Sequence, residues 1–542
     1  MSYSDRPLSE MVVAKLLAGR AATTPDAPFV RFGEAVVTYG ELDRRARRYA
    51  SALERIGVGR GDLIAIMMHN SIDYVALYFG LVYRGAAVVL VNTAFRGYML
   101  EYVLNDAGCQ LLVVDADLAG AIQESQPRLT ALRRVLVTGE SDLSESAPPR
   151  TCAWLGASHG DLEFVDFTAA VAAAGESEPD LTVGYADLHC VVYSSGTTGP
   201  SKGIMISNGH AVAKAFEVIK ICGFAADDVL YSPLPLFYSM GLLRGVLSVA
   251  LLGASIVLRD RFSVSAYWDD VRQHGVTVAH SVFSLPRMLI SAPPSPRDRE
   301  HKLRCMYNAR HDPEFTDRFG VRLIEGYGLT EAGNAIFSRV DQPAVPGSCG
   351  QVSDEWEVRL ADPDGTQVPV GEVGEILIRP LEPQRIMMGY LNKPEATATA
   401  TRDLWLHTGD LATVDGDGFY FYKGRIKDMI RRRGQNISAW EVEQVILEYP
   451  GVGEVAALAH PSDVGDDDLR VVISPAEGAT VELAEVARYC EKRLPDFMVP
   501  RYLEVLTELP RTPSGRVEKY RLAQLPFSEG ALDRGAGARR GR

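Results

Sequence analysis

Short apolar segments that alternate with helical patterns are the feature that most constrains how this chain folds. In the first four-fifths of its 542 residues, seven apolar runs have the length and composition of β-strands. Between several of these runs, apolar residues recur at helical spacing, as over residues 41–56 and 74–84. Strands that alternate with helices usually pair in parallel, so the pattern predicts an α/β fold with mainly parallel sheets. The predicted strands are Leu63–Met67, Val88–Val91, Leu111–Val114, Arg134–Val137, Leu188–Tyr193, Ser255–Leu258 and Val276–Ala279.

Changes in composition along the chain predict further structural units. Residues 139–182 are rich in Ser, Ala, Glu, Gly and Pro, which predicts a surface excursion. Residues 347–421 contain short strand patterns with Asp-Gly turns, which predict a small β-rich subdomain. Beyond residue 424 the pattern is that of a compact α+β unit. Its predicted helices and strands are Ala439–Leu447, Val455–Ala459, Val471–Ile473 and Val481–Leu494.

These units define the predicted domain organisation. We expect a large N-terminal domain over residues 1–424 and a small, mobile C-terminal domain over residues 425–527. Residues 528–542 are rich in Gly and Arg and predict a disordered tail.

Charge and cysteine content exclude some classes of function. The net charge of −14 argues against general nucleic-acid binding, because nucleic-acid phosphates favour an excess of Lys and Arg. A local loop can still hold the phosphates of a nucleotide in an acidic protein. The seven cysteines show no paired spacing, so we expect reduced thiols and a cytoplasmic location.

No segment has the features of a signal peptide or a membrane span. The first ten residues are polar. The most apolar stretch, Gly241–Leu258, is interrupted by Arg244 and is shorter than the ~20 apolar residues that a transmembrane helix needs. We predict that it forms a buried helix followed by a strand over Ala254–Leu258.

The segment Val192–Gly203, with the sequence V-Y-S-S-G-T-T-G-P-S-K-G, is the most informative motif. It follows an apolar strand directly, and its three glycines allow successive backbone N–H groups to turn toward one point. Its hydroxyls add neutral donors, and Lys202 adds a positive charge. The G-x-x-x-x-G-K-[ST] pattern of kinases and GTPases is absent, so the segment predicts a phosphate loop of another type.

This loop resembles the signature loop of the adenylate-forming superfamily, which contains acyl-CoA ligases, luciferases and the adenylation domains of peptide synthetases. In that family the loop closes over the β- and γ-phosphates of ATP. The resemblance implies a catalytic role for Lys202 on those phosphates. It also implies that ATP is bound by Ser194, Ser195, Gly196, Thr197, Thr198 and Gly199.

Residues 325–331, with the sequence E-G-Y-G-L-T-E, resemble the second signature of the family. The resemblance implies that Tyr327 stacks on adenine, that Thr330 bonds the AMP phosphate and that Glu331 carries Mg²⁺. An aromatic face suits a purine, and a hard cation prefers carboxylate oxygen. The implied ATP-binding set also includes Glu325, Gly326 and Gly328.

Three further segments follow in the order of the family. The W-L-H-T-G-D segment ends in Asp410, which by resemblance accepts hydrogen bonds from both ribose hydroxyls. The Y-K-G-R-I-K-D segment resembles the family hinge, in which Arg425 contacts the ribose or the α-phosphate. Lys427 lies in the part of the hinge about which the C-terminal domain rotates between two half-reactions. Residues 510–519 resemble the C-terminal signature, so the likeness extends over about residues 20–525.

The C-terminal signature departs from the family at one position. Relatives carry a Gly-Lys pair whose Lys reaches the substrate carboxylate and the α-phosphate, whereas this chain has Arg516 there. Arginine keeps the charge but differs in size and shape. Three outcomes are open: Arg516 substitutes, Lys519 takes over, or adenylation is slow. We favour Arg516, which we count among the catalytic residues.

The expected acid pocket departs from the family in two places. The motif P-L-P-L-F-Y-S-M-G has Tyr238 where relatives usually have His, so a neutral phenol replaces a titratable group. The region before the second signature is shortened, as in some carnitine-CoA ligase-like members, and places Arg310 and His311 either against the acid or in an exposed loop. The predicted pocket also includes Phe237 and Met240.

The motifs together imply an enzyme that uses ATP and Mg²⁺ to adenylate a small acid, with pyrophosphate as the second product. We expect the acyl-AMP to be passed to CoA, as in carnitine-CoA and fatty acyl-CoA ligase-like members. One alternative is the activation of nitrite for diazotisation of an aryl amine without CoA. Another is a family member that has lost its catalytic activity. The sequence leaves the acid, and the choice between monomer and homodimer, open.

Overall fold

The computed structural model describes residues 6–139, 158–159, 162–194, 201–282, 285–307, 311–426, 429–432, 435–462, 467–494, 496–511 and 516–535. The described residues form two compact units. The first unit takes its residues from Met1–Ser194, Ser201–Glu357 and Arg379–Thr399. The second takes its residues from Val358–Ile378 and Ala400–Arg542. The domain boundary expected at residues 424 and 425 stays a prediction.

A nine-stranded sheet is the first layer of the first unit, with the order β21-β10-β9-β4-β3-β5-β6-β8-β7. The pairs from β9 through β8 are parallel, as the sequence pattern predicts, and β7, β10 and β21 are antiparallel to their neighbours. The strands are β3 (Leu63–Met67), β4 (Ala87–Leu90), β5 (Leu111–Asp115), β6 (Arg134–Thr138), β7 (Ser158–His159), β8 (Leu162–Asp166), β9 (Leu188–Ser194), β10 (Lys202–Ser207) and β21 (Gly389–Tyr390).

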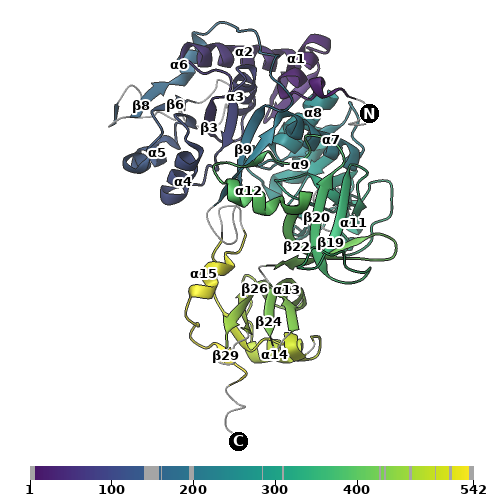
Figure 1. Ribbon diagram of the computed structural model, residues 1–542. Helices are drawn as coiled ribbons and strands as arrows, with labels where there is room; N and C mark the ends of the chain where they lie inside the picture. The colour runs from purple at the N-terminus through teal and green to yellow at the C-terminus, as the bar shows by residue number, and fades with distance from the viewer. Residues whose placement is uncertain are drawn as a thin grey trace, which may run out of the picture. The chain divides into compact units, whose positions relative to one another are not determined.

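Helices cover both faces of this sheet because its central strands are apolar on both sides. α4 (Gly97–Ala107) and α5 (Ala119–Ser125) pack on one face in a single hydrophobic cluster with the strands. α2 (Tyr39–Arg55), α3 (Ile72–Tyr83) and α6 (Phe167–Ala172) lie on the other face, as Figure 1 shows. Helices α2 and α3 confirm the two helical patterns of the sequence, with boundaries shifted by one or two residues.

A seven-stranded sheet is the second layer, with the order β15-β14-β13-β11-β12-β1-β2. All of its pairs are parallel except β1 with β2. The strands are β1 (Pro28–Phe32), β2 (Ala35–Thr38), β11 (Val229–Ser232), β12 (Ser255–Leu258), β13 (Val278–His280), β14 (Cys305–Tyr307) and β15 (Arg322–Ile324).

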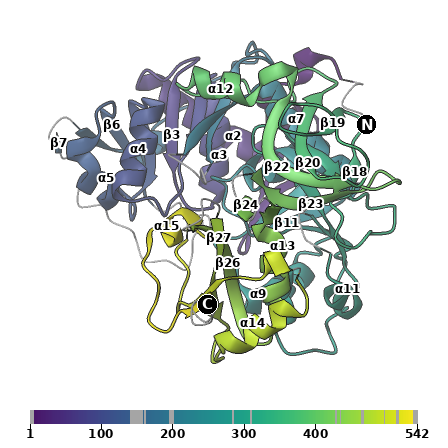
Figure 2. The same ribbon diagram turned by 60° about the horizontal axis from the view of Figure 1, so that its bottom comes forward.

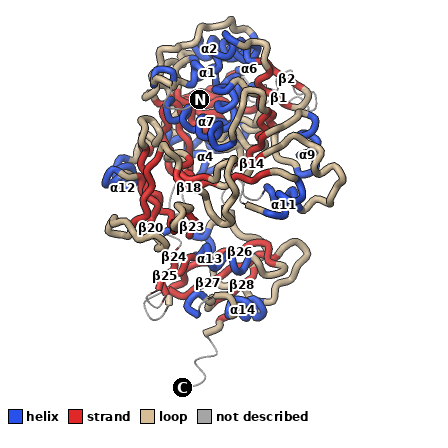
Figure 3. The backbone as a smooth tube through the Cα atoms, turned by 90° about the vertical axis from the view of Figure 1, so that its right-hand side faces the viewer, coloured by secondary structure: helices blue, strands red, loops and turns tan. Residues whose placement is uncertain are grey.

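One helix, α7 (Asn208–Cys222), is buried between the two sheets. It contacts β9 and β10 of the first sheet and β14 of the second. The outer face of the second sheet is covered by α9 (Val264–Gln273), α10 (Leu285–Ile290) and α11 (Pro313–Phe319). Figure 3 shows β14 between α7 on one side and α9 and α11 on the other. Nearly all side chains of α7 are therefore buried, including charged ones.

Smaller sheets follow the two large ones. A three-stranded sheet contains β16 (Gly326–Gly328), β17 (Asn334–Phe337) and β18 (Gln351–Val352). A four-stranded sheet contains β19 (Trp356–Ala361), β20 (Gly374–Pro380), β22 (Leu406–Val414) and β23 (Tyr420–Arg425), which lie side by side in Figure 2. The latter confirms the predicted β-rich region, and Gly365 and Gly418 turn the chain with φ of +83° and +82°.

The C-terminal part of the second unit is an α+β arrangement, as predicted. Two helices pack on its sheet in one hydrophobic cluster. The elements are β24 (Met429–Arg432), β25 (Gln435–Ser438), α13 (Ala439–Leu447), β26 (Val452–Pro461), β27 (Asp467–Pro475), α14 (Leu483–Glu491), β28 (Tyr502–Val505), α15 (Lys519–Gln524) and β29 (Leu532–Asp533). The remaining helices among the described residues are η2 (Leu8–Glu10), α1 (Val13–Thr23), η3 (Gln126–Arg128), η4 (Leu242–Val246), α8 (Leu247–Leu252), α12 (Pro394–Ala400), η5 (Arg402–Leu404) and η7 (Asp496–Met498).

Two sequence expectations are wrong in part. The surface excursion predicted over residues 139–182 contains β8, an inner strand of the nine-stranded sheet, with Phe164 only 1% exposed. The short strand pattern of β8 was not recognised because the surrounding sequence is rich in Ser, Ala and Glu. The tail predicted to be disordered contains β29, which pairs with β28.

Three other expectations agree with the described residues. The stretch 241–258 forms the π-helix η4, the helix α8 and the strand β12, and nearly all of their residues are buried. None of the described helices combines the length and the hydropathy that a membrane span requires. Six cysteines are buried free thiols: Cys109, Cys190, Cys222, Cys305, Cys349 and Cys490. Cys152 lies outside the described residues.

Candidate active site

Neighbouring parallel strands of the second sheet lead directly into the predicted site segments. β11 is followed by the P-L-P-L-F-Y-S-M-G motif, β14 by the shortened region and β15 by Glu325. The register pairs His280 with Tyr307 and Tyr307 with Ile324, so these strands end in one row. Loops at the carboxyl ends of parallel strands are where α/β proteins bind ligands. The fold thus gathers segments that are far apart in the sequence.

Two asparagines at the carboxyl edge of the first sheet hold the acid-pocket motif. The Asn70 amide donates to the carbonyl of Leu234 at 2.9 Å and accepts from the N–H of Leu236 at 2.7 Å. The Asn92 amide donates to the Tyr238 hydroxyl at 3.3 Å. Both sheets therefore contribute to the position of this motif.

The predicted pocket residues are only partly brought together. The rings of Phe237 and Tyr238 meet edge to face with centroids 4.6 Å apart, and both side chains are half-buried, as is Met240. The backbone N–H of His311 donates to the Glu325 carboxylate at 3.2 Å. Arg310 lies outside the described residues.

The phosphate loop connects two adjacent antiparallel strands, β9 and β10. Residues 195–200, which carry most of the predicted phosphate contacts, lie outside the described residues, as does the side chain of Ser194. Ser194 pairs with Lys202 in the β-ladder, so the two ends of the loop are neighbours.

Lys202 is linked to Glu331 by an aromatic side chain that sequence reasoning missed. The Lys202 ammonium nitrogen lies 4.5 Å from the centroid of the Tyr390 ring. The Tyr390 hydroxyl donates to Glu331 Oε1 at 3.0 Å. Burial and the neighbouring Glu331 raise the pKa of Tyr390, so the hydroxyl stays protonated and can donate. Tyr390 belongs to the two-residue strand β21, which is too short to give a periodic sequence signal.

The second signature forms a tight hairpin between β16 and β17. Gly328 pairs with Asn334, and the N–H of Leu329 donates to the carbonyl of Gly333 at 3.3 Å. Thr330 and Glu331 are therefore at the tip of the turn. A Cβ on Gly328 would lie 2.4 Å from Asn334 Oδ1, which explains the glycine. Tyr327 is 8% exposed.

Buried ionisable side chains lie behind this turn. Lys214 of α7 donates to the carbonyls of Ala332 and, at 3.4 Å, Leu329. His210 contacts the same Ala332 carbonyl at 3.0 Å. Burial lowers the pKa of Lys214 well below its ordinary value and Arg244 lowers it further, whereas Glu217 and Glu331 raise it. Sequence reasoning missed this cluster, although residues 210, 214 and 217 share one face of a mostly apolar helix.

The T-G-D motif of the second unit is held by a dense polar network. Arg425 Nε donates to Asp410 Oδ1 at 2.8 Å, and the Tyr422 hydroxyl donates to the same oxygen at 3.4 Å. The β-ladder places Asp410 opposite Arg425. The N–H of Gly409, whose φ is +71°, donates to Glu375 Oε1 at 2.9 Å. The structure therefore brings two predicted ribose contacts together and adds Tyr422 and Glu375.

The two candidate cations of the C-terminal signature, Arg516 and Lys519, lie in different surroundings. Arg516 is exposed. Lys519 begins α15, and its ammonium forms an ion pair with Glu443 of α13 at 2.7 Å. Residues 512–515 between Arg511 and Arg516, and the hinge residue Lys427, lie outside the described residues.

Glu331 has the chemistry of a Mg²⁺ ligand. One of its carboxylate oxygens accepts from Tyr390, and its Oε2 accepts no hydrogen bond from the described residues. A half-buried carboxylate with one oxygen that accepts no such hydrogen bond fits a hard divalent cation.

A different group, His69, Asp115 and Asp117, has ligand atoms within 4.8 Å of one another at the carboxyl ends of β3 and β5. It includes no residue predicted to bind Mg²⁺.

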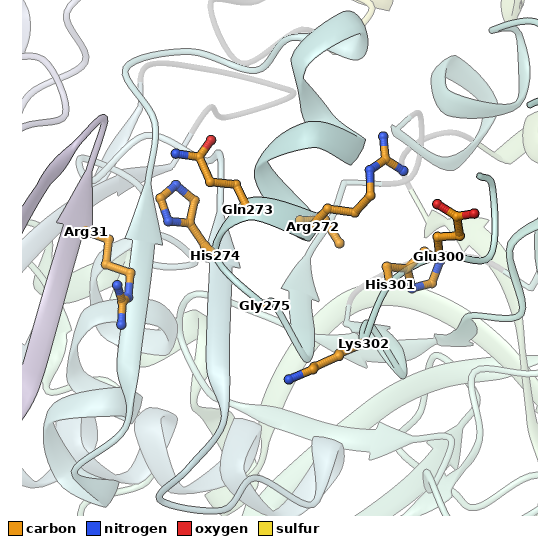
Figure 4. Close-up of a pocket in the computed structure, with 9 residues that line it drawn as sticks. Arg31, Arg272, Gln273, His274, Gly275, Glu300, His301 and Lys302 are labelled. Carbon is orange, nitrogen blue, oxygen red and sulfur yellow. The ribbon is translucent and has the colours of Figure 1, made fainter.

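A cavity of about 740 Å³ lies elsewhere on the first unit (Figure 4). His274 and Lys302, which help to line it, precede β13 and β14, whereas the signature residues follow the parallel strands. Arg31 of β1 also lines it. None of the predicted site residues is part of this cavity, so its size does not identify the site.

Asp115 makes stability depend on pH. Burial raises its pKa to about 6, against an ordinary value near ~4, although the N–H of His69 and the hydroxyl of Thr138 donate to it. Between ~pH 4 and ~6 the folded chain holds a proton that the unfolded chain has lost, so this stabilisation is present at low pH and disappears as pH rises. We expect the free energy of unfolding of Asp115→Asn, relative to wild type, to increase by roughly 2–3 kcal/mol from pH 4 to pH 7. Urea unfolding of both proteins at each pH measures this difference. A difference in free energy of unfolding that stays constant from pH 4 to pH 7 would contradict the prediction.

Comparisons with known proteins agree with these motifs. A family model described as AMP-binding enzyme matches residues 17–391, and that of the AMP-binding enzyme C-terminal domain matches residues 441–516. A feruloyl-CoA synthase of an Amycolatopsis species is 32% identical over 92% of this chain and 96% of its own. A crotonobetaine/carnitine–CoA ligase of Salmonella typhi is 30% identical over 90% and 92%. The ATP-bound structure of MatB from Rhodopseudomonas palustris has a TM-score of 0.81 and 26% identity, with 94% of this chain and 98% of MatB covered. The chain therefore belongs to the AMP-binding enzymes, the adenylate-forming superfamily, and is an ATP-dependent ligase of that type.

Proposed function

We propose that this protein adenylates a small carboxylic acid with ATP and transfers the acyl group from acyl-AMP to CoA. The observation that carries the proposal is the connection from Lys202 through the Tyr390 ring to Glu331. It brings a cation next to the phosphate loop together with a carboxylate suited to Mg²⁺. The CoA ligases among the similar proteins support the choice of acceptor.

The chemistry requires charge neutralisation and alignment more than proton transfer. A carboxylic acid with a pKa near ~4 is already an anion at neutral pH and needs no general base. Its oxygen attacks the α-phosphorus, the bond to the bridging oxygen breaks, and pyrophosphate leaves with the electron pair. Lys202 and the loop N–H groups hold the negative charge of the leaving group. Bound Mg²⁺ would be held by Glu331 and would neutralise phosphate charge.

Residues of the second unit are proposed to bind the ribose and the reacting phosphate. Asp410 is buried and held by Arg425, which leaves it oriented as an acceptor for ribose hydroxyls. Arg516 takes the place of the usual lysine, because Lys519 is already paired with Glu443. The rotation of a domain over residues 425–527 about Lys427 stays part of the proposal.

The acid is activated in a pocket formed by Phe237, Tyr238, Met240 and His311. The phenol of Tyr238, held by Asn92, is a neutral group there. Arg310 is proposed to belong to the same pocket. Two similar proteins are named for ferulate and for crotonobetaine or carnitine, and these acids are the first to test.

The test of this proposal is ATP–pyrophosphate exchange without CoA, across aliphatic and aromatic carboxylates and nitrite. We expect exchange with at least one carboxylate, followed by CoA-dependent release of AMP. Exchange with nitrite alone would contradict the proposal and favour the diazotising alternative. Silence with every acid would favour a catalytically inactive member. Glu331→Gln should abolish any exchange, which excludes a contaminating ligase.

Arg516→Ala is expected to separate the two half-reactions. Loss of a preorganised charge should lower the rate of adenylation about 10²–10³-fold, whereas the consumption of supplied acyl-AMP by CoA should stay close to wild type. Lys519→Met serves as the comparison, because it tests the rival cation. A larger loss of adenylation in Lys519→Met, or equal loss of both half-reactions in Arg516→Ala, would show that Arg516 is misassigned.

Tyr390→Phe is expected to weaken the site without removing the ring beneath Lys202. The change deletes the hydrogen bond to Glu331, and the loss of such a supporting partner typically costs about 10–100-fold in activity or metal affinity. Tyr390→Leu should cost more, because it also removes the contact with the Lys202 ammonium. Steady-state exchange rates at several Mg²⁺ concentrations measure both effects. Equal rates for the Phe variant and wild type would contradict this role.

A further inference from the structure

Lys214 is a fully buried lysine, and its surroundings explain its position. It lies on α7, which is packed between the two large sheets, and its side chain is 0% exposed. Its ammonium donates to the backbone carbonyls of Leu329 and Ala332. These carbonyls lie on either side of Thr330 and Glu331 in the chain. Lys214 therefore holds the turn of the second signature from the helix behind it.

Lys214 is part of a buried cluster of ionisable side chains. Glu217, one turn further along α7, accepts from the N–H of Asn334 at 3.0 Å. Its carboxylate also lies 3.8 Å from Arg244 and 3.9 Å from Arg385. A buried ion of this kind is rarely retained for stability alone, since apolar side chains of similar volume often serve as well. What an apolar side chain cannot do is donate to two carbonyls.

Arg244 extends the cluster toward the acid-pocket motif. It belongs to the π-helix η4, a rare geometry that occurs often near functional sites. Its guanidinium donates to Ser239 Oγ at 3.2 Å and to Asn334 Oδ1 at 3.3 Å. The same buried cluster thus contacts the acid-pocket motif at Ser239 and the hairpin that carries Glu331 at Asn334.

We propose that Lys214 is a positioning residue that fixes the Leu329–Ala332 turn so that Glu331 and Thr330 meet Mg·ATP. Tyr390 holds the carboxylate of Glu331, and Lys214 holds the backbone on both sides of it. Lys214 touches neither nucleotide nor acid in this role. The inference rests on the proposed role of Glu331 in Mg·ATP binding, and it does not depend on the identity of the acid.

The experiment is calorimetric titration of ATP into the full-length protein, with excess Mg²⁺ and again with EDTA. Methionine retains most of the apolar volume of Lys214 and removes the ammonium that donates both hydrogen bonds, so Lys214→Met is the main variant. We expect its affinity for Mg·ATP to fall about 10–100-fold, with a much smaller change in EDTA. Lys220→Met is the matched control, since Lys220 is on the same helix but pairs at the surface with Asp354 and Glu355. It should bind like wild type in both conditions.

A milder variant guards against misfolding of Lys214→Met. Lys214→Gln keeps an amide NH₂ group that can donate to a carbonyl and should lose less affinity for Mg·ATP than the Met variant. Thermal unfolding monitored by circular dichroism shows which variants are folded. Mg·ATP affinity equal to that of Lys220→Met in a folded Lys214 variant would overturn the inference, as would equal losses with Mg²⁺ and with EDTA. Wild type that binds no Mg·ATP would overturn it too, whereas wild type that binds Mg·ATP but activates no acid would overturn only the proposed function.

Discussion

The hydrogen bond from Tyr390 to Glu331 is the interaction on which the arrangement of the first unit's candidate site depends. It joins β21, at the edge of the nine-stranded sheet, to the hairpin that follows the seven-stranded sheet. Lys202 lies on the adjacent strand β10 and contacts the same ring, so the exit of the phosphate loop is held near the same carboxylate. Two parallel sheets that each bring loops to their carboxyl edges need such a connection, because backbone pairing within each sheet cannot set one sheet's loops against the other's.

The sequence predicted the parts of the fold that follow from local periodicity. The strands β3 and β12 and the helix α13 have the predicted boundaries, because apolar runs and helical spacing are patterns of residues close together in the sequence. β8 was missed because its five residues alternate in burial within a polar, Ser-rich segment. The site was predictable only where a motif carried it. Tyr390, Asn92 and Lys214 act through contacts with residues that are 59, 146 and 115 positions away, for which local sequence periodicity gives no signal.

The buried charges of α7 also show why hydropathy alone misreads this helix. Lys214 and Glu217 lie among apolar neighbours and would be assigned to solvent by composition. They are buried because α7 contacts both sheets at once, a property of the tertiary arrangement. Glu217 even occupies the space that a Cβ on Gly333 would need, since its Oε1 lies 1.7 Å from that position. Glu217 on the helix therefore requires a glycine at position 333 of the hairpin, although the two residues are distant in the chain.

A turn that presents a carboxylate to a phosphate-bound cation has to resist the attraction of that cation. In the role proposed for it, Glu331 held only at its carboxylate could follow the cation by moving its backbone. Held only at its backbone, it could change rotamer. The structure restrains both, with Tyr390 at the carboxylate and Lys214 at the flanking carbonyls. Preorganised polar groups contribute most to catalysis when they need not rearrange as charge develops. The need to restrain both the carboxylate and the backbone of Glu331 explains why a lysine is buried between the two sheets despite its desolvation cost.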